Sequence, residues 1–201
     1  MNGRLVVFEG LDGCGKSTQL ERVAAALRAA GHDPLVTREP TDGPWGRRIR
    51  EMARSGQAID PEEELRWFLE DRREHAAAEL RPALAAGRLI LCDRYFLSTV
   101  AYQGARGLDW RKILVASEAE FPLPDLVLIF DLAPAAALER VRARGAALEP
   151  VFERADFLER VAGIFAELDR PYLERIAAEG SPDEVEAETL AVLERRLGVS
   201  L

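Results

Sequence analysis

Hydrophobic residues along this chain follow two alternating patterns. Four short runs, at residues 4–9, 34–37, 88–92 and 125–130, are largely apolar, which is typical of strands buried in a sheet. The stretches between them repeat apolar residues every three or four positions, as amphipathic helices do. Strands that alternate with helices predict parallel pairing through right-handed crossovers. The expected fold is therefore a three-layer α/β fold, with helices on both faces of a parallel sheet.

The helical stretches have recognisable beginnings and ends. They are predicted at residues 17–30, 46–55, 61 onward, 97–103, 109–119, 134–144, 153–178 and 185–197. Asp60 suits a helix cap, and the acidic run of Glu62, Glu63 and Glu64 suits a first turn and needs no other role. No clear apolar run near the carboxyl terminus predicts a last strand, so we expect four strands plus the remnant of a fifth. No repeat or linker divides the chain, which predicts a single domain over residues 1–201.

Composition narrows the class of protein. A chain of 201 residues that is 48% hydrophobic and 31% charged can bury a core, which excludes a disordered protein. A net charge of −8 argues against binding to nucleic acid or to an anionic membrane, although a local basic pocket can still hold a small anion. Cys14 and Cys92 are too few for a disulfide framework or a four-ligand zinc site, and we expect buried thiols. The sequence shows no signal peptide or membrane-length apolar stretch, so the expected location is the cytoplasm.

The segment after the first predicted strand carries the strongest motif. Ligands of parallel α/β sheets bind beyond the carboxyl ends of the strands, and here a strand is followed by G-x-x-x-x-G-K-[ST] and then a helix. The residues predicted to bind ATP are Gly10, Leu11, Asp12, Gly13, Cys14, Gly15, Lys16, Ser17 and Thr18. Glycines allow backbone N–H groups to surround phosphate oxygens, and Lys16 can reach the terminal phosphates. The Ser17 hydroxyl is placed to ligate Mg²⁺.

Two rare residue types sharpen this assignment. Of 27 basic residues only Lys16 and Lys112 are lysine. One of these two lysines stands at the position where the motif requires lysine, which favours a true phosphate-binding loop over a chance match. A GTPase is expected to carry an Asn-Lys-x-Asp motif, and Asn2 is the only asparagine. Protein-kinase signatures are missing for the same reason. A small phosphotransferase with a P-loop NTPase fold remains.

A second anion site is predicted from the ends of the next two strands. Arg38 follows the second strand and Arg94 follows the third, and two guanidinium groups facing the P-loop can hold a phosphate. A triphosphate cradled by the loop does not need them, whereas a phosphorylated acceptor does. Asp93 ends an apolar strand, where a carboxylate can hold a magnesium-bound water.

Two further groups suggest a pocket for a flat heterocycle. Phe68 and Arg72 lie one helical turn apart, so an aromatic ring and a guanidinium donor share a face. The segment of residues 98–104 adds hydroxyl and amide groups just past Arg94.

These residues together resemble the thymidylate kinase family. The resemblance rests on residues 8–19, on Thr37-Arg38-Glu39-Pro40, and on Asp93-Arg94-Tyr95 with Ser98 and Ala101-Tyr102-Gln103-Gly104. It extends from the amino terminus to about residue 144. It implies transfer of the γ-phosphoryl group of ATP to dTMP, giving dTDP, with Mg²⁺. It also implies a homodimer formed by helix packing.

The resemblance implies a role for each residue of the acceptor site. Phe68 would stack on thymine, Arg72 would bond its carbonyl edge, and Thr99 and Gln103 would complete the base contacts. Tyr102 would disfavour a ribose 2′-hydroxyl, Asp12 would approach the 3′-hydroxyl, and Arg38 and Arg94 would hold the acceptor phosphate. The substrate-binding set is therefore Asp12, Arg38, Phe68, Arg72, Arg94, Thr99, Tyr102 and Gln103, and the metal set is Ser17 and Asp93.

The family also implies a short mobile lid, here at about residues 142–153. The variable P-loop positions carry no basic residue, so charge on the migrating phosphoryl group would be met by Arg142 or Arg144. The expected catalytic set is Lys16, Asp12, Arg94, Arg142 and Arg144. Family members of this type usually have an arginine where this chain has Val151, and Arg154 is a candidate substitute.

Two other functions stay open from the sequence. One is a kinase for another nucleoside monophosphate or for a deoxynucleoside. A deoxynucleoside carries no phosphate, so with that acceptor Arg38 and Arg94 would be dispensable. The other is a nucleotide-binding protein with weakened catalysis, which the altered lid permits. A coupled ADP-release assay across nucleoside monophosphates separates these functions.

Overall fold

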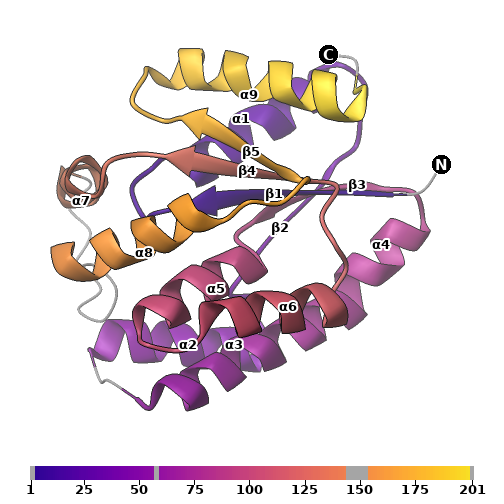
Figure 1. Cartoon of the computed structure of the whole chain (residues 1–201). Coiled ribbons are helices and arrows are strands. Elements are labelled where there is room, and N and C mark those ends of the chain that lie inside the picture. Colours follow the sequence, from indigo (N-terminus) through magenta and orange to yellow (C-terminus); the bar gives the residue numbers. More distant parts are fainter. Residues whose placement is uncertain (1–2, 57–58, 144–153, 200–201) are drawn as a thin grey trace.

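The computed structural model describes residues 3–56, 59–143 and 154–199, and its strands form one parallel sheet. The strand order is β2-β3-β1-β4-β5, and every neighbouring pair is parallel. The strands are β1 (Arg4–Gly10), β2 (Leu35–Arg38), β3 (Leu89–Asp93), β4 (Leu126–Asp131) and β5 (Leu173–Ala177). Figure 1 shows this sheet between two layers of helices, which confirms the predicted three-layer α/β fold.

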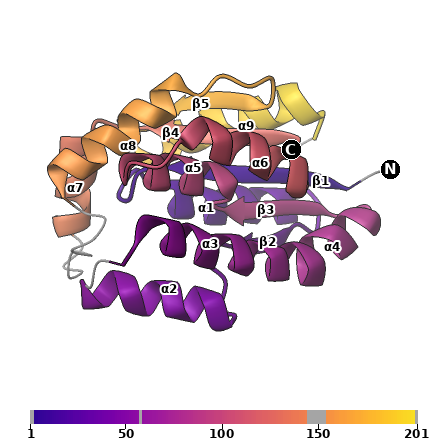
Figure 2. The ribbon, with the colours of Figure 1, turned by 60° about the horizontal axis from the view of Figure 1, so that its bottom comes forward.

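Helices cover both faces of the sheet. They are α1 (Lys16–Ala29), α2 (Pro44–Ser55), α3 (Pro61–His75), the π-helical turn η1 (Ala76–Leu80), α4 (Arg81–Ala85), α5 (Phe96–Ala105), α6 (Trp110–Glu120), α7 (Pro134–Ala143), α8 (Ala155–Glu167) and α9 (Pro182–Leu197). On one face α1 packs on β1 and β3 and against α9 (Figure 1). On the other face α5 packs on β1 and contacts α3, α6 and α8, with α2 outside α3 (Figure 2).

The core explains why the strands read as continuous apolar runs. Every residue of β1 after Arg4 is buried, as is every residue of β4 before Asp131, because helices cover both faces. The rings of Phe8 and Phe130, on these adjacent strands, stack with centroids 5.7 Å apart. Full burial of such a side chain contributes about 1.5–3 kcal/mol, so β1 and β4 contribute strongly to the stability of the fold.

The predicted helix over residues 153–178 is wrong in its second half. Helix α8 ends at Glu167, and residues Leu173–Ala177 form β5, which pairs with β4. Only Ile176 of this edge strand is buried, so its sequence LERIA shows no apolar run and fits a helical pattern equally well. The fifth strand therefore exists, and pairing with β4 decides its conformation.

Strand register brings the expected site residues to one edge of the sheet. Arg38 of β2 lies opposite Asp93 of β3, and Asp93 lies opposite Phe8 of β1. The segments that follow these three strands therefore start side by side at the carboxyl edge, where ligands of such sheets bind. Among the described residues, no helix combines the length and apolar composition that crossing a bilayer requires.

Candidate active site

The P-loop joins β1 to α1 and wraps around the start of the helix. Gly10, Gly13 and Gly15 all have positive φ angles, a conformation that other residues rarely adopt. At Gly13 a Cβ atom would also lie 2.2 Å from the carbonyl oxygen of Ala137 in α7, so no side chain fits there. The loop is thus held against α7, and its backbone N–H groups stay free of side chains that would block an anion.

Lys16 is the first residue of α1 and is buried within the loop. Its Nζ donates to the carbonyl oxygen of Leu11 at 3.3 Å and pairs with the Asp12 carboxylate at 3.4 Å. An ammonium group held at the positive end of a helix is the arrangement that binds the terminal phosphates of a nucleotide.

Ser17 and Asp93 offer oxygen ligands beside the loop. The Ser17 hydroxyl donates to Oδ2 of Asp93, while Oδ1 of Asp93 is buried and has no hydrogen-bond partner. A carboxylate oxygen without a partner next to a hydroxyl fits Mg²⁺, which binds through one or two carboxylates and completes its shell with water and phosphate. No group of three or more His, Cys, Asp or Glu side chains that could hold a metal ion occurs in the described part of the chain.

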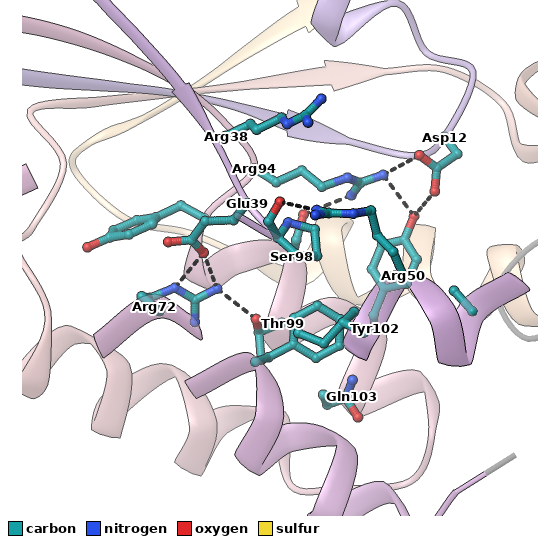
Figure 3. A pocket seen from close by; sticks show the side chains of 15 residues that line it. Asp12, Arg38, Glu39, Arg50, Arg72, Arg94, Ser98, Thr99, Tyr102 and Gln103 are labelled. Atoms are coloured by element: carbon teal, nitrogen blue, oxygen red, sulfur yellow. Dashed lines mark hydrogen bonds and ion pairs between the residues drawn. The ribbon is translucent and has the colours of Figure 1, made fainter. Parts of the chain in front are cut away.

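A cavity of about 250 Å³ lies between the P-loop, α2, α3 and α5, and we call it the acceptor pocket. All eight residues of the predicted substrate-binding set line it, although they come from five separate segments of the chain. In Figure 3 the guanidinium groups of Arg38, Arg50 and Arg94 lie at one end, and Arg72, Thr99 and Gln103 lie toward the other. The pocket therefore has a basic end next to the P-loop and a less charged end between the helices.

Arg94 is the central residue of the basic end. It has a φ angle of 67°, unusual for a residue other than glycine, and this turn directs the chain from β3 toward the P-loop. Its guanidinium donates to Ser98 at 2.9 Å, to the Gly10 carbonyl at 3.3 Å, and to Asp12. A backbone conformation of this kind costs about 1–3 kcal/mol, and it persists only where surrounding contacts hold the residue in place.

Asp12 joins the two halves of the site. It accepts from Arg94 and from the Tyr102 hydroxyl at 3.1 Å, and it lies beside Lys16. Burial opposes ionisation of Asp12, but the charges of Arg94 and Lys16 outweigh it and hold the pKa of Asp12 well below its usual range. Asp12 is thus a charged acceptor at neutral pH, able to bond a sugar hydroxyl.

Arg50 also lines the basic end, and the sequence analysis missed it. It projects from α2 and donates to the Pro40 carbonyl at 2.8 Å and to Asp42 at 2.9 Å. Arg38 pairs with the same Asp42 carboxylate at 3.0 Å and is largely exposed, with 62% of its side chain accessible. In the sequence Arg50 is one of three arginines within four residues, and only the packing of α2 against the pocket distinguishes it.

Glu9 is a second residue that the sequence analysis left without a role. It is fully buried in β1 and accepts from the backbone N–H groups of Tyr95, at 2.9 Å, and Ser98, at 3.0 Å. Burial raises its pKa to about 6, although Ser98 and Arg94 act to lower it. Its carboxylate therefore fixes the segment that carries Arg94. In the sequence, the presence of a glutamate inside an otherwise apolar strand is the feature that could have indicated this role.

At the other end of the pocket, Arg72 is held by two side chains. Its Nε donates to Glu39 at 2.8 Å and its Nη2 donates to Thr99 at 2.9 Å, and Nη2 also lies 2.6 Å from the Glu39 carboxylate in an ion pair. Only Nη1, which is buried, has no partner. His75, to which the sequence assigned no role, bonds the other oxygen of Glu39 at 2.9 Å.

Gln103 faces the same end of the pocket from α5. Its amide nitrogen donates to Glu64 at 2.8 Å, and its Oε1 is buried without a partner. Glu64 is fully buried, so the expectation that it only supports a helix first turn is wrong. Helix α3 directs Glu64 inward, whereas its neighbour Glu62 is exposed.

The lid residues lie mostly outside the described part of the chain. Arg142 is exposed in the last turn of α7, and Arg144 and residues 145–153 lie beyond it. Arg154 caps α8 and pairs with Asp156 at 3.3 Å. The structure thus leaves the roles of these arginines as predictions.

The two cysteines are free and buried, as the sequence predicted. Burial raises the pKa of Cys14 and, more strongly, that of Cys92, so both are protonated thiols at neutral pH.

Comparison with known proteins gives the family. A family model described as "Thymidylate kinase" matches residues 8–189. A protein named "Thymidylate kinase" from Desulfotalea psychrophila is 40% identical over 195 residues, covering 97% of this chain and 96% of that protein. Proteins of the same name from Xanthomonas campestris pv. campestris and Akkermansia muciniphila are 44% and 42% identical, covering 95% and 96% of this chain and 83% and 93% of their own lengths. The chain belongs to the thymidylate kinase family.

Proposed function

We propose that this chain transfers the γ-phosphoryl group of ATP to dTMP, giving ADP and dTDP, with ATP on the P-loop and dTMP in the acceptor pocket. The observation that carries this proposal is the position of Asp12. It belongs to the P-loop, lines the acceptor pocket, and contacts both Lys16 and Arg94. The two anion-binding sites are therefore adjacent, as direct transfer of a phosphoryl group between them requires.

On the donor side, each group of the P-loop has a separate task. The backbone N–H groups of residues 10–18 surround the phosphates, and Lys16 binds the terminal ones. Ser17 and Asp93 would hold Mg²⁺, which neutralises phosphate charge when bound. The partnerless oxygen of Asp93 supports this assignment.

On the acceptor side, the basic end would hold the dTMP phosphate and the opposite end its base. Arg94 and Arg38 bind the phosphate, assisted by Arg50. Asp12 would accept from the sugar 3′-hydroxyl, and Tyr102, which donates to Asp12, would exclude a ribose 2′-hydroxyl.

The base contacts follow from the groups left free at the far end. Phe68 stacks on thymine, and Arg72 donates to its O4 through the free Nη1. Thr99 supports Arg72, and Gln103 completes the contacts. Little covalent chemistry is needed, because phosphoryl transfer depends on alignment and on neutralising charge. Lys16, Arg94 and the lid residues Arg142 and Arg144 would supply that positive charge.

The test is a coupled assay of ADP release with the purified chain, ATP and Mg²⁺. dTMP is expected to stimulate ADP release strongly, dUMP less, and dCMP, dGMP and thymidine little. Stimulation by thymidine but not by dTMP would instead indicate a deoxynucleoside kinase. Absence of stimulation by every monophosphate would indicate a nucleotide-binding protein with weakened catalysis.

A further inference from the structure

Two side chains that line the base end of the acceptor pocket each keep one buried polar group without a partner, a donor on Arg72 and an acceptor on Gln103. In Arg72, Nε donates to Glu39 and Nη2 donates to Thr99 and forms an ion pair with Glu39, which leaves the Nη1 group without a partner. Gln103 has its nitrogen bonded to Glu64 and its Oε1 without a partner. Both side chains are buried, Arg72 with 1% and Gln103 with 0% exposure, so unpaired groups there are costly.

This pair of groups matches one pyrimidine edge and opposes another. Thymine and uracil carry an acceptor at O4 next to a donor at N3–H, which complements Arg72 Nη1 and Gln103 Oε1. Cytosine carries a donor at its 4-amino group and an acceptor at N3, so both positions would be mismatched. The direction of the Gln103 amide therefore decides half of the discrimination.

Glu64 determines that direction. An ionised carboxylate only accepts hydrogen bonds, so it must receive the nitrogen of Gln103, which leaves Oε1 for a ligand. The second oxygen of Glu64 lies 3.0 Å from the Arg106 guanidinium, and this positive charge favours the ionised carboxylate. Burial raises the pKa of Glu64, while the Gln103 bond and the Arg106 charge act to lower it.

We propose that Glu64 is a positioning residue that fixes the Gln103 amide with its oxygen toward the acceptor base, and thereby selects a base with N3–H beside O4. This inference rests on the proposed function, because it concerns the same pocket. Glu64 touches no substrate in this account and acts only through Gln103.

Glu64→Gln is the variant that tests this proposal, because Arg106 determines which way the new amide at position 64 is oriented. The positive charge of Arg106, which lies 3.0 Å from this side of residue 64, attracts the oxygen of the new amide and repels its NH2 group, so the amide nitrogen is expected to turn toward Gln103. Gln103 would then have to turn its own oxygen to position 64 and its nitrogen into the pocket. The kcat/KM for dTMP is expected to fall about tenfold or more, mainly through KM, and that for dCMP to stay constant or rise. The matched control Glu62→Gln removes an exposed charge two residues away and should leave the dTMP-to-dCMP ratio unchanged.

A swapped pair separates orientation from simple structural damage. In Glu64→Gln combined with Gln103→Glu, the carboxylate at 103 accepts from the amide at 64 and still offers an acceptor to N3–H. The ratio of kcat/KM for dTMP to that for dCMP is therefore expected to recover toward the wild-type value. This variant also tests the proposal if Glu64→Gln alone does not fold, which a thermal melt would show.

Two outcomes would overturn the proposal: an unchanged substrate ratio in Glu64→Gln, or a swapped pair that folds but does not prefer dTMP. Either result leaves the proposed function intact if the wild-type chain phosphorylates dTMP. A wild-type chain that fails to phosphorylate dTMP, or that prefers dCMP, would instead contradict the proposed function.

Discussion

At the scale of single residues, Lys16 is a charged side chain of the site with only weak hydrogen-bond contacts inside the protein. Lys16 is almost fully buried in the P-loop, and its two contacts, with Leu11 and Asp12, are longer than 3.2 Å. An ammonium group with long contacts and little access to water binds an incoming phosphate strongly, because the low dielectric of the site strengthens the attraction.

We expect Lys16→Ala to lower kcat by at least 10²–10³-fold, the effect of removing one preorganised charge from a phosphoryl-transfer site. The thermal melting temperature should change little, because Lys16 makes no strong bond in the fold. Steady-state kinetics with dTMP measures the first quantity and circular dichroism the second. Lys112→Ala removes the only other lysine, which is exposed on α6, and should leave both unchanged. Wild-type turnover in Lys16→Ala would contradict the P-loop assignment.

His75 connects the base end of the pocket to the surface. Its Nδ1 bonds the buried Glu39 at 2.9 Å, and its Nε2 lies 2.8 Å from Thr37 and 3.0 Å from Glu79. Burial acts to lower the pKa of His75, but the bonds and charges of Glu39 and Glu79 outweigh it and raise the pKa. The imidazolium form is therefore favoured in the folded chain.

This raised pKa predicts a stability that depends on pH. A group with a higher pKa in the folded state stabilises the fold fully below its unfolded pKa of about 6.5, and the contribution disappears as pH rises through the folded value. We expect the free energy of unfolding to fall as pH rises through this window, and to fall less in His75→Gln. Urea unfolding at a series of pH values measures it.

The pH dependence of the wild type alone does not isolate His75, because Glu9 titrates in a neighbouring pH range. The slope of the unfolding free energy against pH must therefore be compared between wild type and variants. The pKa of Glu9 is raised to about 6, so Glu9 also reduces stability as pH rises, from about 4.5 through 6. His32→Gln replaces the only other histidine of the chain and is the matched control for the loss of an imidazole. Equal slopes in the wild type and in His75→Gln would show that His75 is not stabilised as the cation.

Among elements, the packing of α2 against the loop before it shapes the basic end of the pocket. Asp71 in α3 accepts from the backbone N–H and the hydroxyl of Thr41, at 2.8 and 2.6 Å, and so fixes this loop. Gly46 in α2 lies so close that a Cβ atom would come within 1.8 Å of the Thr41 carbonyl oxygen. Because the same helix carries Arg50, its distance from the loop sets the position of that guanidinium.

We expect Gly46→Ala to destabilise the fold by about 1–3 kcal/mol or more, since the backbone at Thr41 must move to admit a methyl group. The KM for dTMP should rise, because Arg50 moves with α2, whereas the KM for ATP should change less. Thermal melts and separate titrations of the two substrates measure these effects. Gly163→Ala in α8, where a Cβ meets nothing within 4 Å, is the matched control and should be neutral or slightly stabilising. A Gly46→Ala variant as stable as the wild type would contradict the close contact.

For the molecule as a whole, the lining of the pocket comes from segments spread over residues 12–103, and a ligand that binds only the folded state stabilises the fold. A ligand at 100 times its Kd stabilises the folded state by about 2.7 kcal/mol. For a domain of this size that corresponds to a rise in Tm of about 5–10 °C. We expect dTMP to give this shift and thymidine or dCMP a smaller one at equal concentration, measured by calorimetry. A larger shift with thymidine than with dTMP would argue against a phosphate site at Arg38 and Arg94.

Three whole-molecule expectations from the sequence stay predictions. They are a single domain over residues 1–201, a homodimer, and a cytoplasmic location. Sedimentation of the purified chain measures the second of these.

The sequence by itself determined the layered fold and the position of the nucleotide site. Buried parallel strands need continuous apolar runs, and a phosphate loop needs glycines and a lysine at fixed spacing, so both leave local patterns in the chain. Among the acceptor residues, Arg38 and Arg94 could be named because they follow strand ends, and Phe68 and Arg72 because they share one helix face. The roles of the other acceptor residues came from the resemblance to the thymidylate kinase family.

Only the tertiary structure decided the features that depend on contacts between distant segments. The edge strand β5 has one buried residue, so pairing with β4 decides it rather than its own sequence. Glu9, Arg50 and Glu64 look like ordinary charged residues in the sequence, and burial beside specific partners gives them their roles. A hydrogen bond between residues 39 positions apart, such as that of Gln103 with Glu64, leaves no local pattern, because its partners meet only when the helices pack.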